Sequence, residues 1–92
     1  MRPKYAASVD KNQKAIADAL RAIGCEVWEI GRPCDLLVGH RGRNYLVEVK
    51  REGTKPRKDQ QDQWDWMEQW PGQVDVCKTP EEAISLVTKE QS

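Results

Sequence analysis

Asp35, Glu48 and Lys50 are the residues whose types and spacing could do chemistry. Asp35 directly precedes the apolar run 36–38, and Glu48 and Lys50 alternate with valines in the next apolar run. Side chains alternate between the two faces of a strand, so Glu48 and Lys50 point the same way. Charged groups inside such a strand are costly unless something pairs with them. A divalent metal ion held by Asp35 and Glu48, with Lys50 beside it, would supply that partner.

Two short strands must position these residues, and a Gly-rich, basic connection over 39–44 joins them. Turn signals and hydrophobic periodicity predict the elements around this pair. The expected order is helix, three strands, helix, strand, helix, over residues 10–23, 27–30, 35–38, 45–50, 58–70, 74–76 and from Pro80 onward.

The first helix has signals at both ends. Asp10 is predicted as its N-cap, with Gln13 three residues later completing a capping-box-like pair, and Gly24 as its C-cap. Its apolar residues recur at helical spacing, which predicts one buried face made of Ala15, Ile16, Ala19, Leu20 and Ile23.

The 92-residue length predicts a single domain over 10–88, with a flexible N-terminal arm over 1–9 and a tail over 89–92. The N-terminus lacks the apolar segment of a signal peptide, and no apolar run reaches membrane-spanning length. Cys25, Cys34 and Cys77 show no metal-binding spacing, which favours reduced thiols and a cytoplasmic protein. Cys34 could be a ligand beside Asp35, but its interpretation as a small buried apolar residue is preferred.

Charge is distributed unevenly although the net charge is zero. Residues 39–58 carry seven basic and two acidic groups, a net charge of +5, whereas residues 59–92 carry two basic and eight acidic groups, a net charge of −6. The basic segment brackets Glu48 and Lys50, so a phosphate backbone could lie across it. An ordinary solvated loop is the alternative interpretation of the same charges.

Pro33, Asp35, Glu48, Val49 and Lys50, followed by Gln61 and Trp64 in a predicted helix, carry a family resemblance. The chain resembles the PD-(D/E)XK nuclease superfamily over residues 10–87. Within it, the chain is similar to the small stand-alone VRR-NUC-type proteins common in phages and prophages. Cys34 interrupts the usual Pro-Asp pair. Asn12 or Gln13 stands where many members carry an acidic residue, which leaves open whether one or two metal ions bind.

The resemblance implies an α/β fold with a restriction-endonuclease-like core, a central mixed β-sheet flanked by helices, in which the Asp35 and Glu48 strands are neighbours. It also implies a hydrolase, a DNA endonuclease that depends on Mg²⁺ or Mn²⁺. Its expected substrate is branched DNA, a four-way junction or a flap, in phage replication, recombination or repair. The expected setting is the cytoplasm of a bacterial host, for a phage- or prophage-encoded homodimer without membrane contact.

Phosphodiester hydrolysis needs an activated water and stabilisation of the charge that develops on phosphate, and a metal ion supplies both. Asp35 and Glu48 offer the oxygen ligands that Mg²⁺ prefers, and the resemblance adds the main-chain carbonyl of Val49. Lys50 would orient or help deprotonate the water and stabilise the developing charge. The resemblance places Gln61 at the catalytic site, with Gln60 as a neighbouring candidate. An exposed glutamine is the alternative interpretation.

Eight residues are candidates for contacts with DNA: Arg32, His40, Arg41, Arg43, Arg51, Lys55, Arg57 and Lys58. His40 is expected at a hairpin tip and not as a general base. Trp64 and Met67 are expected to pack on the sheet, and Trp66 is the better candidate for an exposed interface. Two other functions stay open: a catalytically silent nucleic-acid-binding module derived from a nuclease, and a small interaction protein without a nucleic-acid role.

Overall fold

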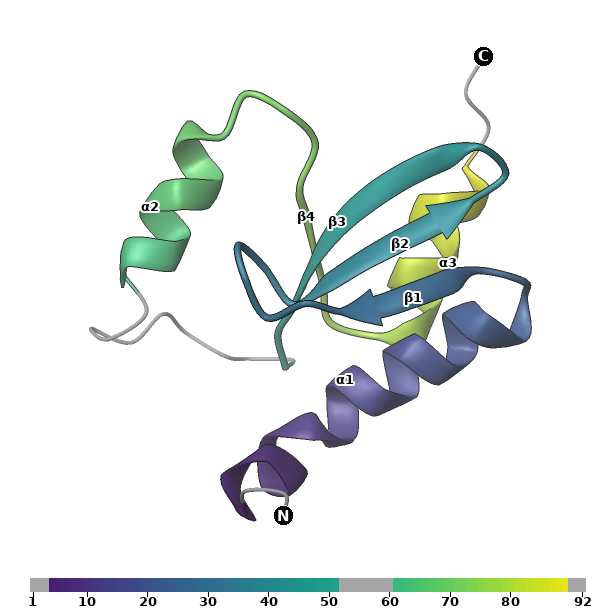
Figure 1. Ribbon diagram of the computed structural model, residues 1–92, viewed down its shortest axis with the longest axis horizontal. Helices are drawn as coiled ribbons and strands as arrows, with labels where there is room; N and C mark the ends of the chain where they lie inside the picture. Colours follow the sequence, from purple (N-terminus) through teal and green to yellow (C-terminus); the bar gives the residue numbers. More distant parts are fainter. Residues whose placement is uncertain (1–3, 52–60, 90–92) are drawn as a thin grey trace.

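The computed structural model describes residues 4–51 and 61–89, with side chains from Lys11 onward in the first range. The elements follow the predicted order (Figure 1). They are α1 Lys4–Ala22, β1 Glu26–Glu29, β2 Leu36–His40, β3 Arg43–Val49, α2 Gln61–Gln69, β4 Asp75–Cys77 and α3 Pro80–Thr88. The predicted start of the second helix at Lys58 lies outside the described residues. None of the described helices is long and apolar enough to cross a lipid bilayer.

The four strands form one mixed sheet in the order β1-β2-β3-β4. The first three are antiparallel, and β4 runs parallel to β3 after the crossover that contains α2. A parallel neighbour requires such a crossover, because a tight turn can only reverse the chain. The Asp35 and Glu48 strands are therefore neighbours, as the resemblance implied.

The core lies on one face of the sheet, under α1 and α3, which pack against each other there (Figure 1). Strand alternation supplies it, because Val27, Val38 and Tyr45 are cross-strand partners that point to the same side. The buried apolar residues are Ile16, Ala17, Leu20, Cys25, Val27, Cys34, Leu36, Val38, Tyr45, Val47, Cys77, Ala83 and Val87. Burial of Cys34 agrees with its interpretation as a small packing residue.

The start of α1 differs from the prediction. The helix begins at Lys4, so Asp10 lies inside it and is not its N-cap, and most of the segment predicted as an arm is helical. Residues 4–23 contain neither Gly nor Pro, and alanines stand at positions 6 and 7, so nothing stops the helix from extending toward the N-terminus. The capping-box pattern is a local signal that this continuous propensity overrides.

The buried face of α1 is also narrower than predicted. Ile16, Ala17 and Leu20 are fully buried, whereas Ala15 and Ile23 are exposed. The predicted stripe was centred too far to one side, because Ala17 was not included in it. The C-terminal helix matches its prediction better: it begins at Pro80, and the Thr79 hydroxyl accepts a hydrogen bond of 3.1 Å from the Glu82 backbone.

The connection between β2 and β3 is shorter than the predicted 39–44. The strands continue to His40 and Arg43, which pair, and only Arg41 and Gly42 form the turn. Both turn residues have positive φ, 52° and 80°, as a twisted two-residue hairpin requires. His40 thus lies at the hairpin tip, as expected.

Candidate active site

Asp35, Glu48 and Lys50 come together at the end of the sheet opposite the hairpin turn. Leu36 pairs with Val47 in the β2–β3 ladder, so the residue before β2 lies beside the end of β3. The Val49 backbone N–H donates to Asp35 Oδ2 at 2.8 Å, and Lys50 Nζ lies 3.1 Å from Glu48 Oε2. The structure therefore brings the three sequence-predicted residues into one cluster.

The backbone carbonyl of Asp35 is hydrogen-bonded to the loop that follows β1. It accepts hydrogen bonds from the backbone N–H groups of Ile30 and Gly31, at 3.0 and 3.4 Å. These bonds close the loop between β1 and β2, while the side chain is tied to β3 through Val49. Hydrogen bonds therefore hold both the backbone and the side chain of Asp35. A functional side chain needs such support to keep its geometry.

Glu48 and Lys50 point away from the core, on the face of the sheet opposite α1 and α3, yet both are buried. Glu48 is 2% exposed and Lys50 is 8% exposed. The valines that alternate with them face the core: Val47 is fully buried and Val49 packs against the core cluster. The predicted alternation is therefore confirmed. Two opposite charges removed from water in this way stabilise each other at a large desolvation cost.

The Glu48 carboxyl has a strongly perturbed proton affinity. Burial, and after it the negative charge of Asp35, raise the pKa of Glu48 from its ordinary value of 4.5 to about 7, although Lys50 and a hydrogen bond from the Asp35 backbone lower it. Desolvation therefore outweighs the ion pair. A site that holds two carboxylates this close, one of them buried, favours an added cation.

Gln63, and not Gln61, is the glutamine of α2 that reaches this cluster. Gln63 Nε2 donates to Glu48 Oε1 at 2.9 Å and lies 3.3 Å from the carbonyl oxygen of Pro33. Gln61 Nε2 instead donates to Asp65 Oδ1 at 2.9 Å, and its side chain is exposed. Gln60 lies outside the described residues. Sequence reasoning missed Gln63, although it stands next to the predicted packing residue Trp64.

Trp64 covers Lys50 from the side of α2. The ammonium lies 5.2 Å from the centroid of the indole ring, within the range of a cation–π contact. The indole Nε1 is buried, and none of the residues that the structure describes is its hydrogen-bond partner. The prediction that Trp66 is exposed is only partly right, because its ring stacks on Trp70 at 5.0 Å and is half-buried.

Asn12, one of the two residues that the resemblance places near a position often acidic in the superfamily, supports the cluster from α1. Its Nδ2 donates to the carbonyl oxygens of Lys50, at 2.9 Å, and of Lys78, at 3.1 Å. These two bonds tie the ends of β3 and β4 to α1. Gln13, the other residue considered for this position, donates to Glu29 Oε1 and lies away from the cluster.

The donor atoms in the cluster fit a hard divalent cation. No group of three or more His, Cys, Asp or Glu side chains within residues 11–51 and 61–89 forms a metal-binding set. Asp35 and Glu48 would therefore be completed by a main-chain carbonyl, predicted to be that of Val49, and by waters. Mg²⁺ is usually bound in this way, by one or two carboxylates with several waters retained. Each carboxylate oxygen has two lone pairs, so Glu48 can keep its protein hydrogen bonds as well.

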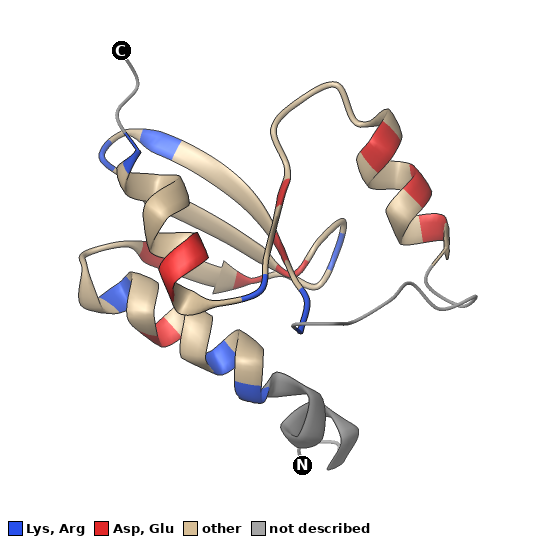
Figure 2. Cartoon of the chain, turned by 180° about the vertical axis from the view of Figure 1, so that it is seen from behind, with Lys and Arg blue, Asp and Glu red and all other residues tan. Residues whose placement is uncertain are grey.

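The predicted DNA-contacting residues separate into two groups (Figure 2). Arg32 and Arg51 adjoin the cluster in the chain and are exposed. His40, Arg41 and Arg43 lie at the hairpin, and Arg43 is five residues along β3 from Glu48, or about 17 Å away at the rise of an antiparallel strand. Within residues 39–51, the part of the basic segment that the structure describes, the basic side chains thus do not form one continuous patch around the carboxylates. Lys55, Arg57 and Lys58 lie outside the described residues.

No protein-family model and no curated protein matches this sequence. A solved structure described as a VRR_NUC domain is similar to this protein. The matched region covers 88% of this chain and 95% of the chain in that structure. The TM-score is 0.60 and the sequence identity is 28%. Its likeness confirms the predicted resemblance to the VRR-NUC type of the PD-(D/E)XK nuclease superfamily. The α/β fold class, with a mixed four-stranded sheet and three helices, is confirmed with it.

Proposed function

We propose that this protein is a metal-dependent DNA endonuclease that hydrolyses phosphodiester bonds. The observation that carries the proposal is the convergence of Asp35, Glu48 and Lys50 at the adjoining ends of β2 and β3. The similar VRR_NUC structure supports the reaction class.

Each residue of the cluster has a separate role in the proposed reaction. Asp35, Glu48 and the Val49 carbonyl would hold Mg²⁺ or Mn²⁺, which when bound supplies Lewis acidity and a more acidic water. Lys50 would hold the attacking water and stabilise negative charge on the phosphate through its ammonium group. Gln63 holds one oxygen of Glu48, and Trp64 limits the positions open to Lys50.

Branched DNA, a four-way junction or a flap, is the substrate we propose, in phage or prophage replication, recombination or repair in a bacterial cytoplasm. The resemblance is the support for this choice. A homodimer would place two active sites on one branched substrate. An apolar row across three strands is available for such an interface: Trp28, 62% exposed, pairs with Leu37, 38% exposed, which pairs with Leu46.

A cleavage assay with labelled four-way junction, flap, duplex and single-stranded substrates tests the proposal, each with Mg²⁺, Mn²⁺ or EDTA. Cutting should require the metal and disappear in Glu48→Ala and Lys50→Ala. Gln69→Ala, at the exposed C-terminal end of the same helix and away from the cluster, is the matched control and should still cut. DNA binding without cutting by the folded wild type would instead indicate a silent binding module, and undiminished activity in Glu48→Ala would refute the assigned site.

A further inference from the structure

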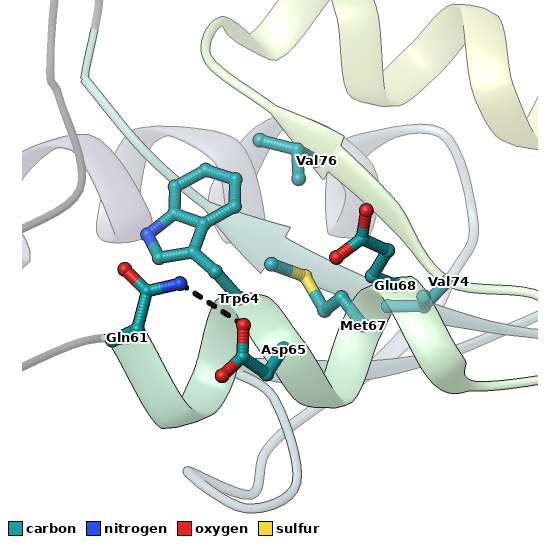
Figure 3. A pocket seen from close by; sticks show the side chains of 7 residues that line it. All are labelled: Gln61, Trp64, Asp65, Met67, Glu68, Val74 and Val76. Atoms are coloured by element: carbon teal, nitrogen blue, oxygen red, sulfur yellow. Dashed lines mark hydrogen bonds between the residues drawn. The ribbon is translucent and has the colours of Figure 1, made fainter.

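A pocket of about 390 Å³ lies between α2 and β4, next to the candidate active site (Figure 3). Its volume is within the range of small-molecule sites. In Figure 3, lining side chains of α2 face Val74, which precedes β4, and Val76, which belongs to β4. The lining residues are Gln61, Trp64, Asp65, Met67, Glu68, Val74 and Val76.

Two lining residues of the pocket are neighbours of active-site residues. Val76 pairs in register with Glu48, so both side chains lie on the same face of the sheet. Trp64 lines the pocket, and the ammonium of Lys50 lies 5.2 Å from its ring. A nucleotide whose phosphate is held at Glu48 and Lys50 would therefore have the pocket within reach of its base.

The lining has the chemistry of a base site and not of a phosphate site. Trp64, Met67, Val74 and Val76 give aromatic and apolar surfaces, against which any base can stack. Asp65 and Glu68 are acceptors when ionised, so they match the exocyclic amino groups of adenine, cytosine and guanine. Helix α2 contains three acidic residues and no Lys or Arg, so it repels phosphate (Figure 2).

We propose that this pocket receives one unpaired nucleobase carrying an exocyclic amino group, from the nucleotide next to the phosphodiester held at Glu48 and Lys50. The inference rests on the proposed function and adds a base-binding subsite to it. An unpaired base is available in a flap or at a branch point, and a base-paired one would first have to leave its stack.

Binding of flap DNA, measured by fluorescence anisotropy with Ca²⁺ in place of Mg²⁺, tests the proposal. Nucleotides near the branch are replaced one at a time by an abasic residue. We expect one position at which the loss of the base weakens binding roughly 10-fold, the effect of one lost stacking contact. At that position thymine, which lacks the amino group, should bind more weakly than adenine, cytosine or guanine.

Two variant pairs locate the effect. Glu68→Gln should reduce the discrimination against thymine, whereas Asp62→Asn, which removes the same charge from α2 outside the pocket, should leave it unchanged. Val74→Phe should fill the pocket and abolish the sensitivity to the abasic residue. Ile23→Phe, at an exposed position after α1 and outside the pocket, is the control for added aromatic surface.

Three results would overturn the inference, and they are distinguishable. If no abasic replacement changes binding or metal-dependent cleavage, the nuclease function is supported and the base pocket is rejected. If Glu68→Gln and Val74→Phe instead weaken binding of a Lys/Arg-rich amphipathic peptide and not of DNA, the pocket takes a cationic protein segment. Absence of both DNA binding and cleavage in the wild type would reject the proposed function, and the subsite with it.

Discussion

Glu48 should make the metal-free protein less stable as the pH rises. Its pKa in the folded protein is about 7, raised from the ordinary value of 4.5, so the folded state keeps a proton that the unfolded state has already lost. A raised pKa contributes stability that is fully present below about pH 4.5 and is lost as the pH rises to about 7. A rise of the pKa from 4.5 to about 7 corresponds to a stability contribution of roughly 3 kcal/mol.

Urea unfolding of the wild type and of Glu48→Gln, in EDTA between pH 4.5 and pH 8, measures this contribution. Glutamine has nearly the same shape as glutamate but does not ionise. We expect the unfolding free energy of the wild type, relative to that of the variant, to fall by roughly 3 kcal/mol over this range. Glu26→Gln, which removes an exposed carboxylate of β1, controls for the loss of one negative charge.

The causes of the shift give a second, sharper comparison. Asp35→Asn removes the neighbouring charge that raises the pKa of Glu48 and keeps an oxygen to accept the hydrogen bond from Val49. The pH dependence should therefore shrink. Lys50→Met removes a group that lowers the same pKa, so the pH dependence should grow. The reasoning would be refuted if the difference in unfolding free energy between the wild type and Glu48→Gln stayed constant with pH. Equal effects of Asp35→Asn and Lys50→Met on the pH dependence would refute it as well.

Three further predictions concern the helices and the hairpin. Gln63→Leu should lower the metal-dependent cleavage rate about 10-fold or more, because it removes a hydrogen bond to a charged group, while Gln69→Leu, at an exposed position of the same helix, should change it little. Arg41→Asn should raise the urea midpoint, because asparagine tolerates the positive φ at this turn position better, and should reduce the salt dependence of DNA binding by about one ion. Leu20→Ala should reduce the unfolding free energy by about 2–5 kcal/mol, whereas a polar substitution at the exposed Arg21 should have a much smaller effect.

The cluster of charged residues could be predicted from the sequence because local rules determine its geometry. Strand alternation puts Glu48 and Lys50 on one face, and a short hairpin places the residue before β2 beside the end of β3. Both rules act within residues 35–50. The burial of the pair, which is the main cause of the raised pKa of Glu48, involves contacts with Gln63 and Trp64 of α2, so the motif alone did not predict it.

The choice between Gln61 and Gln63 shows where local rules stop. At about 100° per residue, the stripe formed by Trp64 and Met67 has Gln61 on one side, about 90° away, and Gln63 on the other, about 70° away. Helical periodicity therefore permits either glutamine at the cluster. The direction in which α2 crosses the end of β3 decides between them, and this direction depends on contacts distant in sequence, such as those of Gln63 with Pro33 and Glu48.

The basic segment presents the same contrast at a larger scale. Seven basic residues lie within twenty positions of the sequence, but Arg43 lies about 17 Å along β3 from Glu48, and Arg41 lies beyond it in the hairpin turn. A duplex rises about 3.4 Å per base pair, so DNA held at both places must span roughly five base pairs. The hairpin can therefore set where the DNA lies without touching the bond that is cut. Under the proposed function, the exposed Arg32 and Arg51, which adjoin the carboxylates in the chain, would assist Lys50 in binding the phosphate that is cut.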